Sequence, residues 1–167
     1  RRILIVQVLG RIFMDPLDDP FAAAAGALKA HTLGGSVNAI FVDMHAEATS
    51  EKTAIGHYLD GQVSCVFGTH THVPTADHQI LPGGTGYMSD VGMCGDYDSV
   101  IGMEKSEPIR RFTRKMPGAR FAPATGEATV CGVYVEIDDK AGLPTYLAPL
   151  RQGGRLGSAW PLPGARD

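Results

Sequence analysis

Two histidines, one residue apart, are the side chains of this 167-residue chain best suited to chemistry. His70 and His72 lie in the segment FGTHTHV (67–73), directly after a predicted buried strand. If the segment is extended, side chains two residues apart point to the same side, and the two imidazoles can converge. Imidazole is a preferred ligand of transition metals. The pair predicts half of a metal site, although both histidines could instead be polar loop residues.

A second polar group follows the preceding predicted strand. Asp43, His45 and Glu47 alternate in the segment DMHAE. Sites in α/β sheets lie beyond the carboxyl ends of the strands, so this group and the histidine pair are expected at the same edge. A third imidazole or a carboxylate could join the metal site from here, while a single histidine after a strand is otherwise an ordinary loop residue. The histidines expected to be structural or on the surface are His31, His57 and His78.

An alternation of strands and helices is predicted to position these residues. Apolar runs predict strands at 3–10, 38–45 and 63–68, and helices are predicted at 19–31 and 48–61. Asp19 can cap the first helix, because Pro20 suits the position that follows a cap. Thr49 or Ser50 could cap the second helix. The order strand, helix, strand, helix, strand indicates βαβ units in a mixed sheet of the α/β class.

The C-terminal part is predicted to be mostly β structure. Residues 80–103 hold six glycines and little periodicity, which indicates short strands joined by turns. The later predicted elements are a short basic helix at 106–116, strands at 127–138 and 143–150, and a hairpin turn at 139–142. The basic helix could attract a nucleotide or RNA, but a solvated face is the commoner role of such a run. We expect one domain over 1–150 and a loose tail over 151–167.

Composition excludes several classes of function. The chain is 44% hydrophobic and 20% charged with a net charge of −3, so a single ordinary globular core is expected and nothing in the charge demands nucleic acid or an acidic membrane surface. No run of 18 apolar residues predicts a membrane span. The three cysteines are widely spaced and odd in number, which favours free thiols and a cytoplasmic location.

Four segments, taken in order, resemble the YmdB-type bacterial metallophosphoesterases, which are dinuclear phosphodiesterases of the calcineurin-like superfamily. The resemblance extends over about residues 3–150. The segments are GRIFMDPLDDPF (10–21), FVDMHAEATSEKTAIGHYLDG (41–61), GTHTHVPTAD (68–77) and LPGGTGYMSDVGMCGDYDSVIGM (81–103). The resemblance implies an α/β/β/α sandwich and an enzyme that hydrolyses phosphodiesters of the cyclic nucleotide type, with 2′,3′- or 3′,5′-cyclic phosphates as substrates.

The same resemblance implies that His45, His70 and His72 are metal ligands, with His45 and His70 on one metal and His72 on the other. The implied cofactors are two divalent or transition metal ions. Iron, manganese or zinc suits imidazole better than magnesium does. Asp77 and Asp90 are expected to hydrogen-bond to the ligand histidines, and the glycine-rich block at 83–102 is expected to lie near the substrate.

The remaining ligands of such a centre are not found in this sequence. The family draws them from Gly-Asp, Gly-Glu-Asn and Gly-Asn-His motifs, but the only asparagine of the chain, Asn38, lies between Val37 and Ala39. The catalytic acid is therefore unknown. We expect a C-terminal portion of the fold that is completed by a missing N-terminal half or forms a homo-oligomer. The alternative is an inactive metal-binding or assembly fragment.

Overall fold

The structure is a computed structural model that describes residues 1–116 and 118–161 of the chain. A five-stranded sheet forms its centre, with strand order β1-β2-β3-β5-β4. Its strands are β1 (Ile3–Leu9), β2 (Ala39–His45), β3 (Cys65–Thr69), β4 (Gln79–Ile80) and β5 (Gly86–Met88). Four of them run parallel, and β4 is antiparallel to β5. The predicted mixed sheet of the α/β class is confirmed.

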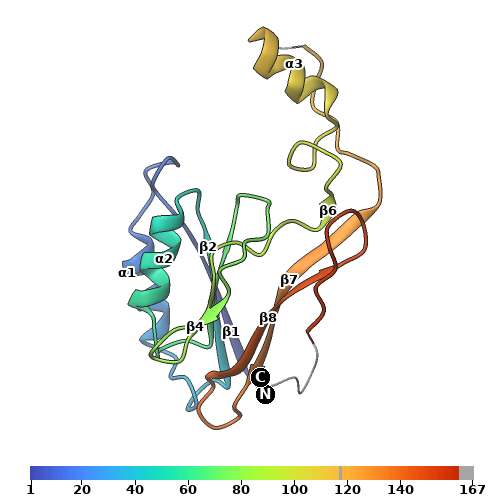
Figure 1. Cartoon of the computed structure of the whole chain (residues 1–167). Helices are drawn as coiled ribbons and strands as arrows, with labels where there is room; N and C mark the ends of the chain where they lie inside the picture. Colours follow the sequence, from blue (N-terminus) through green and yellow to red (C-terminus); the bar gives the residue numbers. More distant parts are fainter. Residues whose placement is uncertain (117, 162–167) are drawn as a thin grey trace.

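Two helices cover one face of this sheet (Figure 1). They are α1 (Pro20–Leu28) and α2 (Thr49–Tyr58), each shorter than predicted. Asp19 caps α1 as expected, because its carboxylate accepts hydrogen bonds from the N–H groups of Phe21 and Ala22 at 2.8 and 3.3 Å. The predicted cap of α2 is wrong, since the helix begins one residue after Ala48, which has no capping side chain.

The core lies between these helices and the central sheet. Alternate residues of β2 point into it, and Ile40, Val42 and Met44 are fully buried there. Side chains of a strand alternate between the two faces. Asp43 and His45 therefore belong to the opposite face, away from the helices.

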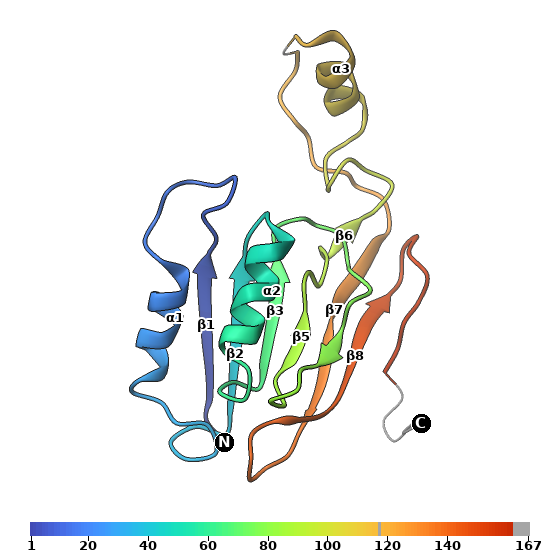
Figure 2. The ribbon, with the colours of Figure 1, turned by 60° about the vertical axis from the view of Figure 1, so that its left-hand side comes forward.

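A second sheet covers part of that opposite face. It consists of β6 (Gly95–Asp96), β7 (Ala128–Ile137) and β8 (Pro144–Gln152), in the order β6-β7-β8. The two sheets approach closely at Gly86, where an added Cβ would lie 3.0 Å from Leu147. Figure 2 shows β7 and β8 beside β5, with β1 at the far edge of the central sheet. Three of the four predicted layers are thus present, in the order α/β/β.

The sheet face at β1 stays open to solvent. Ile3 and Ile5 are 60% and 71% exposed. Both share a face with Asp43 and His45, because Ile5 pairs with Phe41 and Gln7 with Asp43 in the parallel register. The exposed isoleucines thus lie in the first half of β1, and the same face carries the polar residues Gln7 and Asp43 closer to the end of β2.

The predicted domain boundary at residue 150 lies inside β8, which continues to Gln152. Beyond it the chain turns back, and Arg151 and Ala159 exchange backbone hydrogen bonds of 2.7 and 3.0 Å. The part of the predicted loose tail up to residue 161 therefore includes ordered pairing. Residues 162–167 lie outside the described part of the chain.

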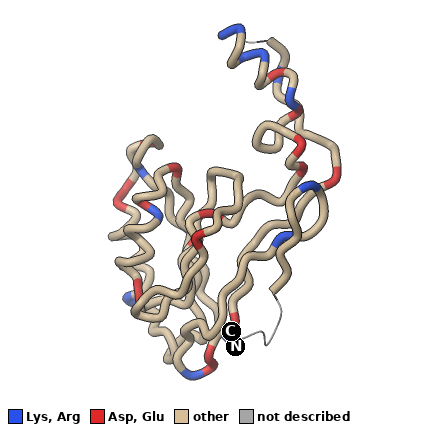
Figure 3. Tube along the Cα trace, viewed as in Figure 1, with Lys and Arg blue, Asp and Glu red and all other residues tan. Residues whose placement is uncertain are grey.

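The predicted basic helix is α3 (Ser106–Arg114), which projects away from the layers (Figures 1 and 2). Figure 3 shows that Lys and Arg positions are frequent along it. Its apolar residues Ile109 and Phe112 are exposed. Among the described helices, none combines the length and the apolar character that a membrane crossing requires.

Candidate metal centre

The predicted site lies where two neighbouring parallel strands end. His45 is the last residue of β2 and Thr69 the last residue of β3, and the two are paired in register. His70 follows Thr69 directly. Both histidines are therefore at the carboxyl edge of the sheet, where ligands of α/β proteins bind.

The structure brings His45 and His70 together. Nε2 of His45 lies 3.3 Å from Nδ1 of His70. The two rings are nearly perpendicular, at 86°. Two nitrogens bound to one tetrahedral metal at about 2.05 Å lie about 3.3 Å apart. The pair therefore has the separation of two ligands on one ion.

A hydrogen-bond chain determines which nitrogen of His45 carries the proton. Thr69 Oγ1 donates to Asp43 Oδ1 at 2.7 Å and lies 2.9 Å from Nδ1 of His45. Because a carboxylate only accepts, the Thr69 hydrogen points to Asp43, and Nδ1–H of His45 donates to the Thr69 oxygen. Gln7 holds the other oxygen of Asp43 at 2.6 Å. In the neutral ring, Nε2 of His45 therefore carries a lone pair.

Glu47 does the same for His70. Its Oε2 lies 3.2 Å from Nε2 of His70, so Nε2–H donates to it and Nδ1 of the neutral ring carries the lone pair. The lone pairs of His45 and His70 thus face each other across 3.3 Å. Two acceptors in this arrangement repel unless a proton or a metal cation lies between them. Carboxylates behind ligand imidazoles are the usual support of a metal site.

His72 has a different hydrogen-bond partner. Its Nδ1 lies 3.0 Å from the carbonyl oxygen of Ile101, which leaves Nε2 as the accepting nitrogen. The extended backbone on which the predicted convergence of His70 and His72 depends is not present. Both have positive φ, 102° and 68°. Positive φ is uncommon outside glycine and frequent at functional sites.

The histidine pair fits part of a coordination sphere, and the described residues do not complete it. Within residues 1–116 and 118–161, no three His, Cys, Asp or Glu side chains are arranged to hold a metal ion. His45 and His70 are thus the two donors whose rings the structure brings into contact.

A buried ion pair holds the loop between His70 and His72. Asp90 accepts from Lys52 Nζ at 2.9 Å, and from Thr71 N and Oγ1 at 3.0 and 2.7 Å. Burial alone would raise the pKa of Asp90, but the hydrogen bonds from Lys52, Thr71 and Gly92 outweigh it and the pKa is lowered. Asp90 therefore acts as an anion that fixes Thr71.

The expected hydrogen bonds from Asp77 and Asp90 to the histidine rings are not what the structure shows. Asp90 binds Thr71, and Asp77 accepts from Thr75 Oγ1 and Ser89 N at 2.7 and 3.2 Å. Both carboxylates support the loop rather than the imidazoles.

Two supporting residues, Thr69 and Lys52, were not identified from the sequence as parts of the site. Thr69 has a signal, since it pairs with His45 once the two strands are aligned as parallel neighbours. Lys52 has none, because a lysine in a predicted helix normally faces solvent. Gly68 is required by packing, since a Cβ there would clash with the carbonyl oxygen of Ser89.

Comparisons with known proteins agree with this architecture. The model of the YmdB-like protein family matches residues 1–150. The chain is 48% identical over 140 residues to a 2′,3′-cyclic-nucleotide 2′-phosphodiesterase of Bacillus subtilis, covering 84% of this chain and 52% of that protein. It is 36% identical over 155 residues to a putative phosphatase/phosphodiesterase of Mycoplasma genitalium, covering 90% of this chain and 53% of that protein.

Two solved structures are similar. One, a hypothetical protein from Thermus thermophilus, has a TM-score of 0.84 at 45% identity, over 92% of this chain and 58% of that one. The other, described as a novel phosphatase of Mycoplasma pneumoniae, has a TM-score of 0.79 at 35% identity, over 89% of this chain and 52% of that one. The chain thus spans about half the length of these relatives. On these grounds, and on the family match over residues 1–150, it belongs to the YmdB-like protein family.

Proposed function

We propose that this chain supplies the histidine half of a two-metal centre that hydrolyses phosphodiesters, with 2′,3′-cyclic nucleotides as the main substrate class. The observation that carries the proposal is the 3.3 Å approach of two accepting nitrogens, Nε2 of His45 and Nδ1 of His70. The Bacillus relative, which is named a 2′,3′-cyclic-nucleotide 2′-phosphodiesterase, supports the substrate class.

Each histidine has a distinct task in this proposal. His45 and His70 hold one metal, and the free Nε2 of His72 holds the second. Metals bound there would supply a water of lowered pKa and would neutralise charge on the phosphate. The ordered chain Gln7–Asp43–Thr69 keeps the His45 ring in the tautomer that a metal needs. Iron, manganese or zinc suits these imidazoles better than magnesium does.

A partner surface is needed for the remaining ligands. The exposed Ile3 and Ile5 share a sheet face with Asp43 and His45, so polypeptide that covers them extends to the edge where His45 lies. We propose that this cover is the counterpart of the portion of the longer relatives that this chain does not match. A homo-oligomer of the chain is the other way to cover the face. Large exposed apolar patches are typical of interaction surfaces.

Light scattering after size exclusion distinguishes these partners. Self-association is supported if the wild-type chain is a homo-oligomer and Ile5→Lys is a monomer. A monodisperse monomer of the wild-type chain would refute it. The matched control is Ile80→Lys, an exposed isoleucine on β4 at the opposite edge of the central sheet.

Hydrolysis tests the function itself. Bis-p-nitrophenyl phosphate and 2′,3′-cyclic AMP are incubated with Mn²⁺ and either the chain alone or the chain joined to the unmatched portion of the Bacillus relative. We expect activity in the joined protein that is lost on His70→Ala and retained on His57→Ala. Activity that survives His70→Ala would overturn the proposal.

A second candidate is a metal-binding module without activity. The lack of a group of three metal-binding side chains among the described residues favours it. This candidate predicts metal binding by His45 and His70 together with no hydrolysis in the joined protein.

A cytoplasmic location is part of the proposal. All three cysteines are free, and burial raises the pKa of the Cys65 thiol to about 12. Unpaired thiols persist in reducing compartments.

A further inference from the structure

A cavity adjoins His72 on the side of the loop that follows β6. Its volume is about 350 Å³, within the range of small-molecule pockets. Apart from the His72 imidazole, its walls carry no ionisable group other than the Tyr97 phenol. The lining residues are His72, Val73, Met93, Tyr97, Ser99, Val100 and Ile101.

Ile101 occupies a backbone conformation that isoleucine normally avoids. Its φ is 47°, in the left-handed region where a β-branched residue is strained. Glycine would place the carbonyl oxygen of residue 101 on His72 without that strain. The side chain is 55% exposed, so burial in the core does not compensate for the strain. What isoleucine adds over glycine is an apolar wall of the cavity.

We propose that this cavity is the subsite for the nucleobase of the substrate; this inference rests on the proposed function. His72, as a metal ligand, would hold the phosphate end of the nucleotide. The nucleobase then needs an uncharged pocket beside His72. Apolar and aromatic walls suit the faces of a flat base, and methionine sulfur packs well against aromatic rings. Met93 and Tyr97 form such walls here.

The Tyr97 wall is held rigidly. Its hydroxyl lies 3.0 Å from the carbonyl oxygens of both His72 and Met93, and it accepts from Met93 N–H at 2.9 Å. The ring therefore keeps its position relative to His72 without a ligand. Because the wall is already in place, binding a rigid ring costs little conformational entropy of the protein.

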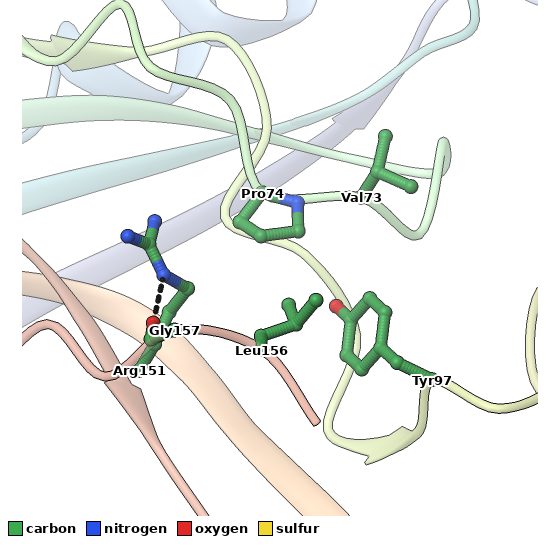
Figure 4. A pocket seen from close by; sticks show the side chains of 6 residues that line it. All are labelled: Val73, Pro74, Tyr97, Arg151, Leu156 and Gly157. Atoms are coloured by element: carbon green, nitrogen blue, oxygen red, sulfur yellow. Dashed lines mark hydrogen bonds between the residues drawn. The ribbon is translucent and has the colours of Figure 1, made fainter. Parts of the chain in front are cut away.

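A second cavity, of about 380 Å³, shares Val73 and Tyr97 with the first (Figure 4). Its remaining walls include Leu156 and Arg151, whose Nε donates to the Gly157 carbonyl oxygen at 3.0 Å. The positively charged guanidinium group of Arg151 is part of the wall of this cavity, and His72 is not. The cavity therefore suits an uncharged base less well and serves as the internal control.

Adenosine binding tests the inference without metal or phosphate. The chain is titrated with adenosine in the presence of EDTA and followed by amide chemical shifts, with ribose 5-phosphate as the probe that lacks a base. We expect saturable shifts at Val100 and Ile101 with adenosine only. Val100→Trp, which fills the cavity, is expected to weaken adenosine binding about tenfold or more. Leu156→Trp, which fills the neighbouring cavity, should leave it within about twofold.

A second variant avoids the ambiguity of a misfolded protein. Ile101→Gly relieves strain, so it should fold at least as well as the wild type and still lose several-fold in adenosine affinity. Phe13→Gly is the matched control, since Phe13 also has a positive φ, of 61°, and is 88% exposed in a different loop. The inference would be overturned if the wild type did not bind adenosine. It would also be overturned if Val100→Trp and Ile101→Gly bound adenosine as tightly as the wild type does. Neither result affects metal binding by His45 and His70, which the proposed function requires.

Discussion

The ammonium group of Lys52 lies 2.9 Å from the carboxylate of Asp90, and the two side chains are only 2% and 1% exposed. This buried pair ties helix α2 to the loop that carries His70 and His72, because Asp90 also accepts two hydrogen bonds from Thr71. The position of the proposed metal ligands thus depends on an ion pair outside the site.

Removal of the ammonium group should destabilise the fold strongly. We expect Lys52→Met to lower the free energy of unfolding by about 3 kcal/mol, because Asp90 would remain charged and buried without its counter-ion. Urea denaturation measures this. The control is Lys105→Met, which breaks the exposed Lys105–Asp98 pair, and the expected loss of stability there is much smaller because solvent screens that pair. Equal losses for the two variants would contradict the role assigned to Lys52.

The lowered pKa of Asp90 predicts how stability depends on pH. An unfolded aspartate titrates near pH 3.9, and the folded one titrates lower. The stabilisation is therefore fully present above about pH 4 and is lost as pH falls through the folded pKa. Asp90→Asn should be less stable than the wild type at neutral pH, and the difference should narrow below about pH 4. A difference that stays constant with pH would show that the charge of Asp90 is not what stabilises the loop.

The hydroxyl of Thr69 should matter for metal binding through His45. Thr69→Val removes the link to Asp43, and we expect metal affinity to fall about 10- to 100-fold, as for other residues that orient ligand imidazoles. Thr69→Ser keeps the hydroxyl and should retain most of the affinity. Equilibrium dialysis with Zn²⁺ measures both. A serine variant as weak as the valine variant would point to lost packing instead of a lost hydrogen bond.

Ile101→Gly should have opposite effects on stability and on binding. Left-handed backbone costs an ordinary residue roughly 1–2 kcal/mol, while glycine has greater freedom to lose on folding, so a net gain in stability of up to about 1 kcal/mol is expected. Thermal denaturation checks this alongside the adenosine titration. A clear loss of stability would mean that the side chain of Ile101 serves the fold.

Much of the fold follows from local sequence. The strands β1, β2 and β3 are apolar runs that alternate with the helices α1 and α2, so their existence and order could be predicted. The start of α1 has a clear signal, Asp19 before Pro20. The pairing of Arg151 with Ala159 could not, because it depends on a turn of the chain without periodicity. The cap of α2 was misassigned since Thr49 and Ser50 both have side chains suited to capping, yet the helix begins at Thr49.

The site was predictable in part for a different reason. That His45 and His70 lie at one edge follows from the topology of parallel strands. The conformation of the segment around His72 does not follow from the topology, because it depends on positive φ at both His70 and His72. A glycine would have indicated positive φ in the sequence, but a histidine does not. The burial of Lys52 depends on Asp90, 38 residues away in sequence. Contacts between residues so distant in sequence cannot be predicted from local sequence patterns.

X-ray absorption of the zinc-loaded chain tests the central claim most directly. The outer-shell scattering of imidazole counts the histidines bound to each metal. With one equivalent of Zn²⁺, we predict two imidazoles in the wild type, one after His70→Ala, one after His45→Ala and two after the control His57→Ala. A spectrum without imidazole scattering, or one that His45→Ala and His70→Ala leave unchanged, would contradict a metal held between these two rings.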